Sequence, residues 1–192
     1  LSETNSQDMF VKEVLEHLSP LLKQAEILAA QYDSVVANPP YMSEKSMNNF
    51  LRSFTREYFL NSKSDLFTCF IERSYSLTEE SGISSMITMQ SWMFLSSFEK
   101  MRSEMLQEKT IGTMTQIGYN SFPTMNSKIA QAAVFSLFNR QINSYQGSFV
   151  NLNTAAQSAN KESIFLARDP DNIFIISTEE FKIIPGSPIA YW

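Results

Sequence analysis

The sequence predicts an α/β layered domain with a largely parallel sheet. Helical and extended patterns alternate along the first 140 residues, as they do where strands are joined by helical crossovers. The run 32–37 is short and β-rich and is stopped by two prolines, which is typical of a buried strand. The chain has 192 residues, of which 43% are apolar and 12% aromatic, so a domain of this length can bury a core.

Two helices are expected before this first strand. Apolar residues recur every four positions at Phe10, Val14 and Leu18, which predicts the first helix. Pro20 cannot donate a hydrogen bond to the preceding turn, so it is expected to end this helix. A second helix then runs to Gln31.

The remaining elements follow in chain order. The polar stretch 42–63 predicts a mobile loop with a short helix. Asp65 is placed to cap a helix that ends at Ser81-Gly82, and Ser96 or Ser97 to cap another. Further strands are expected at 83–89, 111–118 and 129–138, and in a β-rich extension at 147–152, 163–168 and 173–177.

Charge and composition exclude several classes of protein. With 15 basic and 20 acidic side chains the net charge is −5, which does not suit a chain that coats nucleic acid with its whole surface. One cysteine (Cys69) and one histidine (His17) cannot form an internal disulfide and are too few for a closed zinc site. No apolar run approaches the roughly 18 residues of a membrane span. The sequence therefore predicts a cytoplasmic globular protein without a metal or a membrane partner.

The informative motif is Asn38-Pro39-Pro40-Tyr41, directly after the first predicted strand. Ligands of open α/β sheets bind beyond the carboxyl ends of strands. Two prolines stiffen the turn, so the Asn38 side chain and the Pro39 carbonyl present two acceptors to one small volume, as a planar amino group requires. Tyr41 offers a flat face on which a base can stack. The plainer interpretation is a turn that merely ends a strand.

The segment from Val35 to Tyr41 resembles motif IV of the amino-group DNA methyltransferases, specifically the N6-adenine branch. The resemblance continues in order through Ser64–Phe70 (motif V), Met86–Met93 (motif VI) and Ser121–Pro123 (motif VIII). The strings KSDLF, MITMQSWMFLSSFEKMR and IPGSPIAYW resemble the methyltransferases of BREX phage-defence systems more closely still. The resemblance covers almost all of residues 8–192.

This resemblance implies a partial Rossmann-like fold of the methyltransferases that use S-adenosylmethionine. Residues 1–140 would be part of the catalytic domain, with strands equivalent to the fourth to seventh of a seven-stranded sheet. Residues 141–192 would be a β-rich extension that leads toward a target-recognition region.

The resemblance also implies the roles of the motif. A target adenine is flipped out of double-stranded DNA, and Asn38 and the Pro39 carbonyl accept hydrogen bonds from its N6 amine. Pro40 completes the catalytic motif, Tyr41 stacks on the base and Phe122 packs against it. S-adenosylmethionine then methylates N6.

For the cofactor pocket the resemblance implies Asp65, Leu66 and Phe67. Leu66 and Phe67 fit a core-facing helix equally well, so both roles stay open. The family's glycine-rich cofactor loop has no counterpart, because no glycine precedes Gly82. The chain is therefore expected to be the second half of a catalytic domain and inactive alone.

Three functions follow from these patterns. The favoured one is DNA adenine-N6 methylation in a phage-defence or restriction-modification system, with other defence proteins as possible partners. The alternatives are methylation of a glutamine amide in protein, and a non-catalytic binding or scaffolding role. The basic residues that flank the motif loop fit an ordinary solvated loop better than a DNA contact; they are Lys45, Arg52, Arg56 and Lys63.

Overall fold

The computed structural model describes residues 9–119, 121, 131–156 and 159–192. The chain divides into two compact units, residues 1–31 and residues 32–192. The first unit holds one helix, α1 (Met9–Ala29), which passes through Pro20. The predicted break at Pro20 is therefore wrong. A proline removes a single N–H donor, and the backbone hydrogen bonds on both sides of it remain available to continue the helix.

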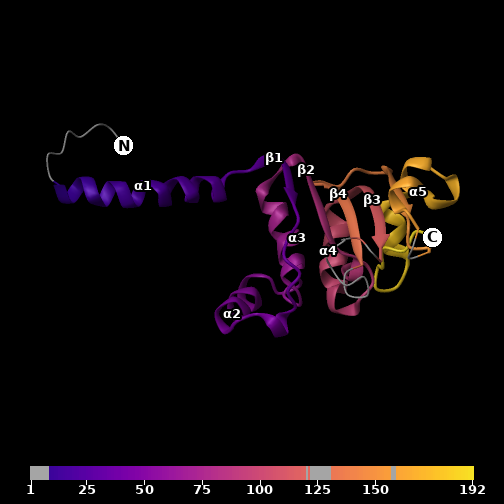
Figure 1. Cartoon of the computed structure of the whole chain (residues 1–192), viewed down its shortest axis with the longest axis horizontal. Helices are drawn as coiled ribbons and strands as arrows, with labels where there is room; N and C mark the ends of the chain where they lie inside the picture. Colours follow the sequence, from indigo (N-terminus) through magenta and orange to yellow (C-terminus); the bar gives the residue numbers. More distant parts are fainter. Residues whose placement is uncertain (1–8, 120, 122–130, 157–158) are drawn as a thin grey trace. The chain divides into compact units, whose positions relative to one another are not determined.

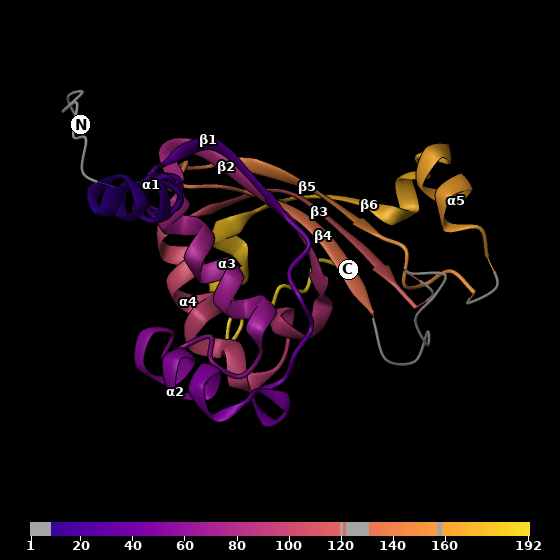
Figure 2. The same cartoon turned by 60° about the vertical axis from the view of Figure 1, so that its left-hand side comes forward.

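The second unit is built on a mixed sheet (Figures 1 and 2). Among the described residues it has six strands in the order β1-β2-β4-β3-β5-β6. They are β1 (Tyr32–Ala37), β2 (Thr78–Met89), β3 (Thr110–Gly118), β4 (Ala132–Phe138), β5 (Gln146–Asn151) and β6 (Ile173–Ser177). β1 pairs parallel with β2 and β3 with β5, whereas β4 and β6 run antiparallel to their neighbours.

The strands β1, β2, β3 and β5 therefore point the same way, which confirms an α/β fold with a mostly parallel sheet. We call the end at which these strands finish the carboxyl end of the sheet. β5 and β6 continue the sheet beyond β3, so the β-rich extension is present. The expected division of the chain at residue 140 stays a prediction about domain organisation.

Two of the helices pack on one face of the sheet. The helices of this unit are α2 (Asn49–Tyr58), α3 (Leu66–Leu77), α4 (Glu99–Glu108) and α5 (Lys161–Ala167). Figure 2 shows α3 and α4 against the same face, with α2 below them. Short 3₁₀ turns join the elements at η1 (Glu44–Ser46), η2 (Gln90–Met93), η3 (Ser96–Phe98), η4 (Pro170–Asn172) and η5 (Thr178–Ile183).

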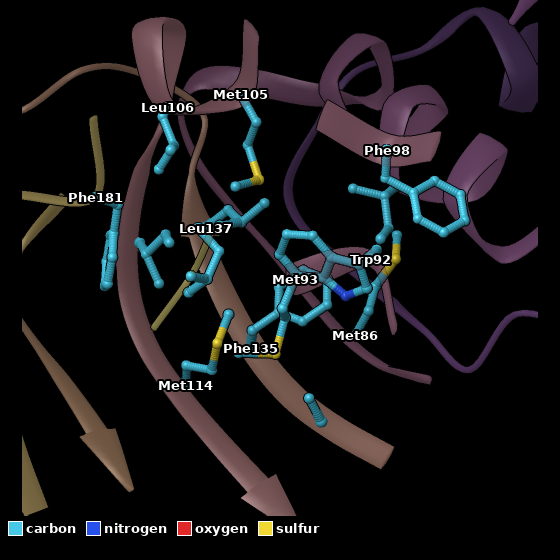
Figure 3. Packing of buried hydrophobic residues seen from close by; sticks show 14 of the residues in the cluster. Met86, Trp92, Met93, Phe98, Met105, Leu106, Met114, Phe135, Leu137 and Phe181 are labelled. Atoms are coloured by element: carbon cyan, nitrogen blue, oxygen red, sulfur yellow. The ribbon is translucent and has the colours of Figure 1, made fainter. Parts of the chain in front are cut away.

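The core lies between this helical layer and the sheet. Trp92 is fully buried, packs edge-on against Phe135 of β4 with ring centroids 5.2 Å apart, and donates its indole N–H to Thr88. Figure 3 shows these two rings among methionines and leucines from β3, β4 and α4. Trp92 is thus a packed aromatic of the core.

Three element boundaries differ from the sequence prediction. α3 ends at Leu77, and Gly82 lies inside β2, where a Cβ atom would meet the Asp33 carbonyl oxygen at 2.7 Å. Residues 163–167 belong to helix α5 and Arg168 is its C-cap; the Asn160 side chain caps the start of this helix by accepting from Ser163 N at 3.1 Å. α4 begins after Phe98 without a side-chain cap, so neither predicted serine caps it.

Arg102 of α4 anchors the C-terminal segment. The side chain is 1% exposed, and burial lowers the pKa of its guanidinium. It donates to the carbonyl oxygens of Trp92, Leu95, Gly186 and Ser187 at 2.6–3.2 Å. These bonds hold residues 186–187 against the segment that follows β2, near the carboxyl end of the sheet.

Candidate active site

The Asn38-Pro39-Pro40-Tyr41 motif follows β1 directly, as the sequence predicted. β1 is paired with β2 up to its last residue, Ala37, so the motif begins where the ladder ends, at the carboxyl end of the sheet. Asn38 and Pro40 are exposed and Pro39 is buried. The amide of Asn38 is therefore presented to solvent from a turn whose backbone is fixed by two prolines.

Tyr41 is held by the helical layer. Its ring is half-buried and meets the ring of Phe67 edge-on, with centroids 6.0 Å apart and planes at 83°. Burial also raises the pKa of the Tyr41 hydroxyl. Phe67 itself is 1% exposed and packs against Phe98, so it supports Tyr41 from within the core.

Asp65 ties the motif loop to α3. Its Oδ1 accepts from Met42 N at 3.0 Å and from Phe67 N at 3.4 Å, and the second bond confirms Asp65 as the N-cap. Leu66 N donates to the Met42 carbonyl at 2.9 Å. Burial raises the pKa of the Asp65 carboxyl, while the backbone N–H groups oppose this shift. The residue after the motif is thus fixed to the start of α3.

The structure therefore brings together two of the predicted residue groups. Asn38–Tyr41 and Asp65–Phe67 meet at the carboxyl end of β1. Phe122 lies outside the described residues, so its role as a partner of the base stays a prediction. Ser121 beside it donates to the Gly118 carbonyl and accepts from Ala132 N, which joins the end of β3 to the start of β4.

A network of side-chain amides at the carboxyl end escaped the sequence analysis. Gln90, the residue after β2, donates to Gln131 and accepts from Gln116 and Asn153. The network joins β2, β3, β4 and the segment after β5. In the sequence, this network could be suspected only from Asn and Gln residues at or just beyond the ends of predicted strands. Which of these side chains pair with each other depends on the order of the strands in the sheet.

Other candidate residues play structural roles or stand apart. Cys69 is buried, and burial raises the pKa of its thiol to about 11, so it is no nucleophile at neutral pH. His17 is exposed on α1. Within the described residues, no group of three or more His, Cys, Asp or Glu side chains is arranged to hold a metal ion. None of the described helices is long and apolar enough to cross a membrane.

The chain is similar to several known proteins. A model of the family described as Eco57I restriction-modification methylase matches residues 3–122. The adenine-specific methyltransferase BrxX of Escherichia coli O9:H4 (strain HS) is 40% identical over 186 residues, covering 96% of this chain and 15% of that protein. The adenine-specific methyltransferase PglX of Lacticaseibacillus casei (strain Zhang) is 36% identical over 179 residues, with 91% and 15% covered. The chain thus spans about 15% of the length of these curated relatives.

A solved structure shares the fold. The methyltransferase subunit of a type I restriction-modification system from Streptococcus thermophilus superposes with a TM-score of 0.59 at 17% identity. The superposition covers 82% of this chain and 37% of that subunit.

Proposed function

Because the chain belongs to the Eco57I restriction-modification methylase family, we propose that it forms the target-base side of a DNA adenine-N6 methyltransferase in a phage-defence or restriction-modification system. Double-stranded DNA is the substrate and S-adenosylmethionine the methyl donor. The observation that carries the proposal is Asn38, an exposed amide on a stiffened turn at the carboxyl end of the sheet. The names of the two relatives support adenine as the target.

The motif can prepare an aromatic amine for methylation. The lone pair of the adenine N6 is delocalised into the ring, so this nitrogen is a weak nucleophile. The Asn38 side-chain oxygen and the Pro39 carbonyl each accept one N–H of the amine, which fixes the nitrogen and returns electron density to it. S-adenosylmethionine supplies an electrophilic methyl group when it is bound. No general base is required before transfer, because the methylated nitrogen loses its extra proton to water afterwards.

The base reaches this turn only outside the duplex. A flipped adenine is read by stacking and by hydrogen bonds to its Watson–Crick edge. Tyr41 supplies the stacking face, held edge-on by Phe67, and Phe122 packs against the base. Pro40 keeps Tyr41 at a fixed distance from Asn38, because its φ angle is locked.

The residues at the start of α3 fit one wall of a cofactor site. Asp65 is a half-buried carboxylate and Leu66 is partly exposed. Both lie beside Met42, because Asp65 Oδ1 accepts from Met42 N and Leu66 N donates to the Met42 carbonyl. Phe67 is buried behind them and supports the wall. A glycine-rich phosphate or ribose loop is not among residues 1–81, so we expect the remaining cofactor contacts from outside this chain.

The test is Asn38→Ala in the full-length protein, with N6-methyladenine in DNA measured by mass spectrometry. Loss of one positioned hydrogen-bond partner of the reacting group is expected to lower the rate by about 10²–10³-fold. Asn49→Ala, the same change at an exposed position in α2, serves as the matched control and should keep the wild-type rate.

Two results would overturn the proposal. Wild-type methylation of adenine by Asn38→Ala would remove Asn38 from the chemistry. Methylated glutamine in protein, with unmodified adenine in DNA, would assign the same motif to an amide substrate instead.

A further inference from the structure

A partly open cavity of about 330 Å³ lies between two segments of the second unit. One wall is the turn after α2, and the other is formed by η3 and the start of α4. The lining residues are Leu60, Asn61, Lys63, Ser96, Ser97 and Lys100. The volume is far larger than the roughly 30 Å³ of one water molecule. The cavity can therefore hold a group much larger than a solvent molecule.

Positively charged groups and hydrogen-bond donors line the cavity. Lys63 is half-buried and Lys100 exposed, and among the described residues the ion pairs are Arg56 with Glu44 and Lys109 with Glu108. The hydroxyl groups of Ser96 and Ser97 can each donate a further hydrogen bond. Two carboxylates are bonded to this segment: Glu104 accepts from Asn61 Nδ2 at 2.6 Å, and Glu72 accepts from Ser62 beside it. The six residues that line the cavity itself carry two ammonium groups and no carboxylate.

The other basic residues of this region are committed to the protein. Arg52 donates to the carbonyl oxygens of Glu44, Lys45 and Met47 and so holds η1 in place. Arg56 contacts the Glu44 carboxylate at 2.6 Å. The structure thus separates Lys63 from the two arginines with which the sequence grouped it, and joins it instead to Lys100.

Both walls of the cavity are fixed relative to the motif. The turn that carries Lys63 is anchored by Ser62, which is fully buried, donates to Glu72 and accepts from Thr68. Asp65 follows two residues after Lys63 and binds Met42 N. The other wall follows η2 and therefore the carboxyl end of β2. The cavity thus adjoins the segments that leave β1 and β2 at the end of the sheet where Asn38 lies.

We propose that this cavity binds a backbone phosphate of the DNA substrate, an inference that rests on the function proposed above. Phosphate oxygens are acceptors only, and they suit a cavity lined by two ammonium groups and two hydroxyls. Flipping a base displaces its own backbone. A phosphate held at a fixed place beside the motif therefore sets the register of the DNA. The contact carries no sequence information.

The experiment measures how DNA binding depends on salt. Lys63→Gln, Lys100→Gln and the double variant are made in the full-length protein, and the dissociation constant of a fluorescent duplex is measured across salt concentrations. Each phosphate that is no longer neutralised reduces the slope of log K against log salt by about 0.9, and both lysines would contact the same phosphate. We expect the double variant to lose about one unit of slope and to bind about 3–10-fold more weakly at low salt.

Lys182→Gln is the matched control. Lys182 is exposed in η5, whose Thr178 accepts from Ile111 N near the start of β3, at the opposite end of the sheet. This variant removes one positive charge and should keep the wild-type slope. Unchanged thermal unfolding of all variants shows that the fold is kept.

The outcomes are distinct. An unchanged slope in the double variant, or an equal loss of slope in Lys182→Gln, overturns the proposal. Calorimetric binding of inorganic phosphate that is lost in the double variant, with an unchanged slope on DNA, assigns the cavity to a free anion and also overturns it. If Asn38→Ala methylated adenine at the wild-type rate while the Lys63/Lys100 double variant lost the expected salt slope, the proposed chemistry would be rejected and the phosphate site would stand.

Discussion

Replacing Asp65 by alanine should destabilise the second unit by about 2–4 kcal/mol. Asp65 Oδ1 accepts from Phe67 N at 3.4 Å as the cap of α3, and from Met42 N at 3.0 Å. Removing an N-cap costs about 0.5–2 kcal/mol, and the length of this bond places it at the lower end. Removing a hydrogen bond to a charged, half-buried partner costs about 1.5–3 kcal/mol, because Met42 N is left without its acceptor.

Asp65→Asn separates the hydrogen bonds from the charge. The amide oxygen of asparagine accepts from the same two N–H groups, so we expect a loss below about 1 kcal/mol. Burial raises the pKa of Asp65, which means that the folded protein favours the uncharged form of this side chain. As pH falls from neutral through this raised pKa toward 3.8, wild type should gain stability relative to Asp65→Asn.

Urea unfolding of the 192-residue chain, followed by tryptophan fluorescence, measures these changes because Trp92 is fully buried in the core. Equal stability of Asp65→Ala and Asp65→Asn would show that the two hydrogen bonds accepted by Asp65 Oδ1 do not stabilise the fold. The same pair tests the cofactor wall. If Asp65 also contacts the cofactor, Asp65→Asn should weaken binding of S-adenosylhomocysteine by the full-length protein at least about tenfold while the fold is kept.

Two further predictions concern the interior. Gly82→Ala should lower the free energy of unfolding by about 1–3 kcal/mol, because the new Cβ meets the Asp33 oxygen and Thr78 Cγ2 at 2.7 Å. Ser81→Ala, at the exposed position beside it, should change this free energy by less than about 0.5 kcal/mol. The midpoints of urea unfolding compare the two variants. Cys69 has a thiol pKa of about 11, so at pH 8 about one molecule in a thousand carries a thiolate, and iodoacetamide should label the native chain at least about 100-fold more slowly than the unfolded chain. The stability that its neutral thiol contributes is present below pH 9 and is lost as pH rises toward 11. Cys69→Ala should therefore lose less stability over this pH range. Rapid labelling of the native protein at pH 8 would contradict the buried thiol.

Local patterns were sufficient for much of the fold. The β-rich run before two prolines became β1, Asp65 became a helix cap, and 173–177 became β6. They failed where two local signals compete. Pro20 weakens a helix without stopping it, and the short apolar run at 163–168 suits either a strand or a helix until the Asn160 cap decides.

The sequence alone determined where the candidate motif lies, because Asn38-Pro39-Pro40-Tyr41 follows a strand and ligands bind beyond strand ends in this class of fold. Only the tertiary structure decided what surrounds it. Asp65 binds Met42 N from 23 residues away, and Gln90 binds Asn153 across 63 residues. Lys100 of α4 lines the same cavity as Lys63 of the turn after α2. These contacts depend on the order of the strands and on the packing of α3 and α4. The periodicity of apolar residues in the sequence indicates which side of a helix or strand is apolar. Which distant side chains share one cavity depends on how the helices and strands pack.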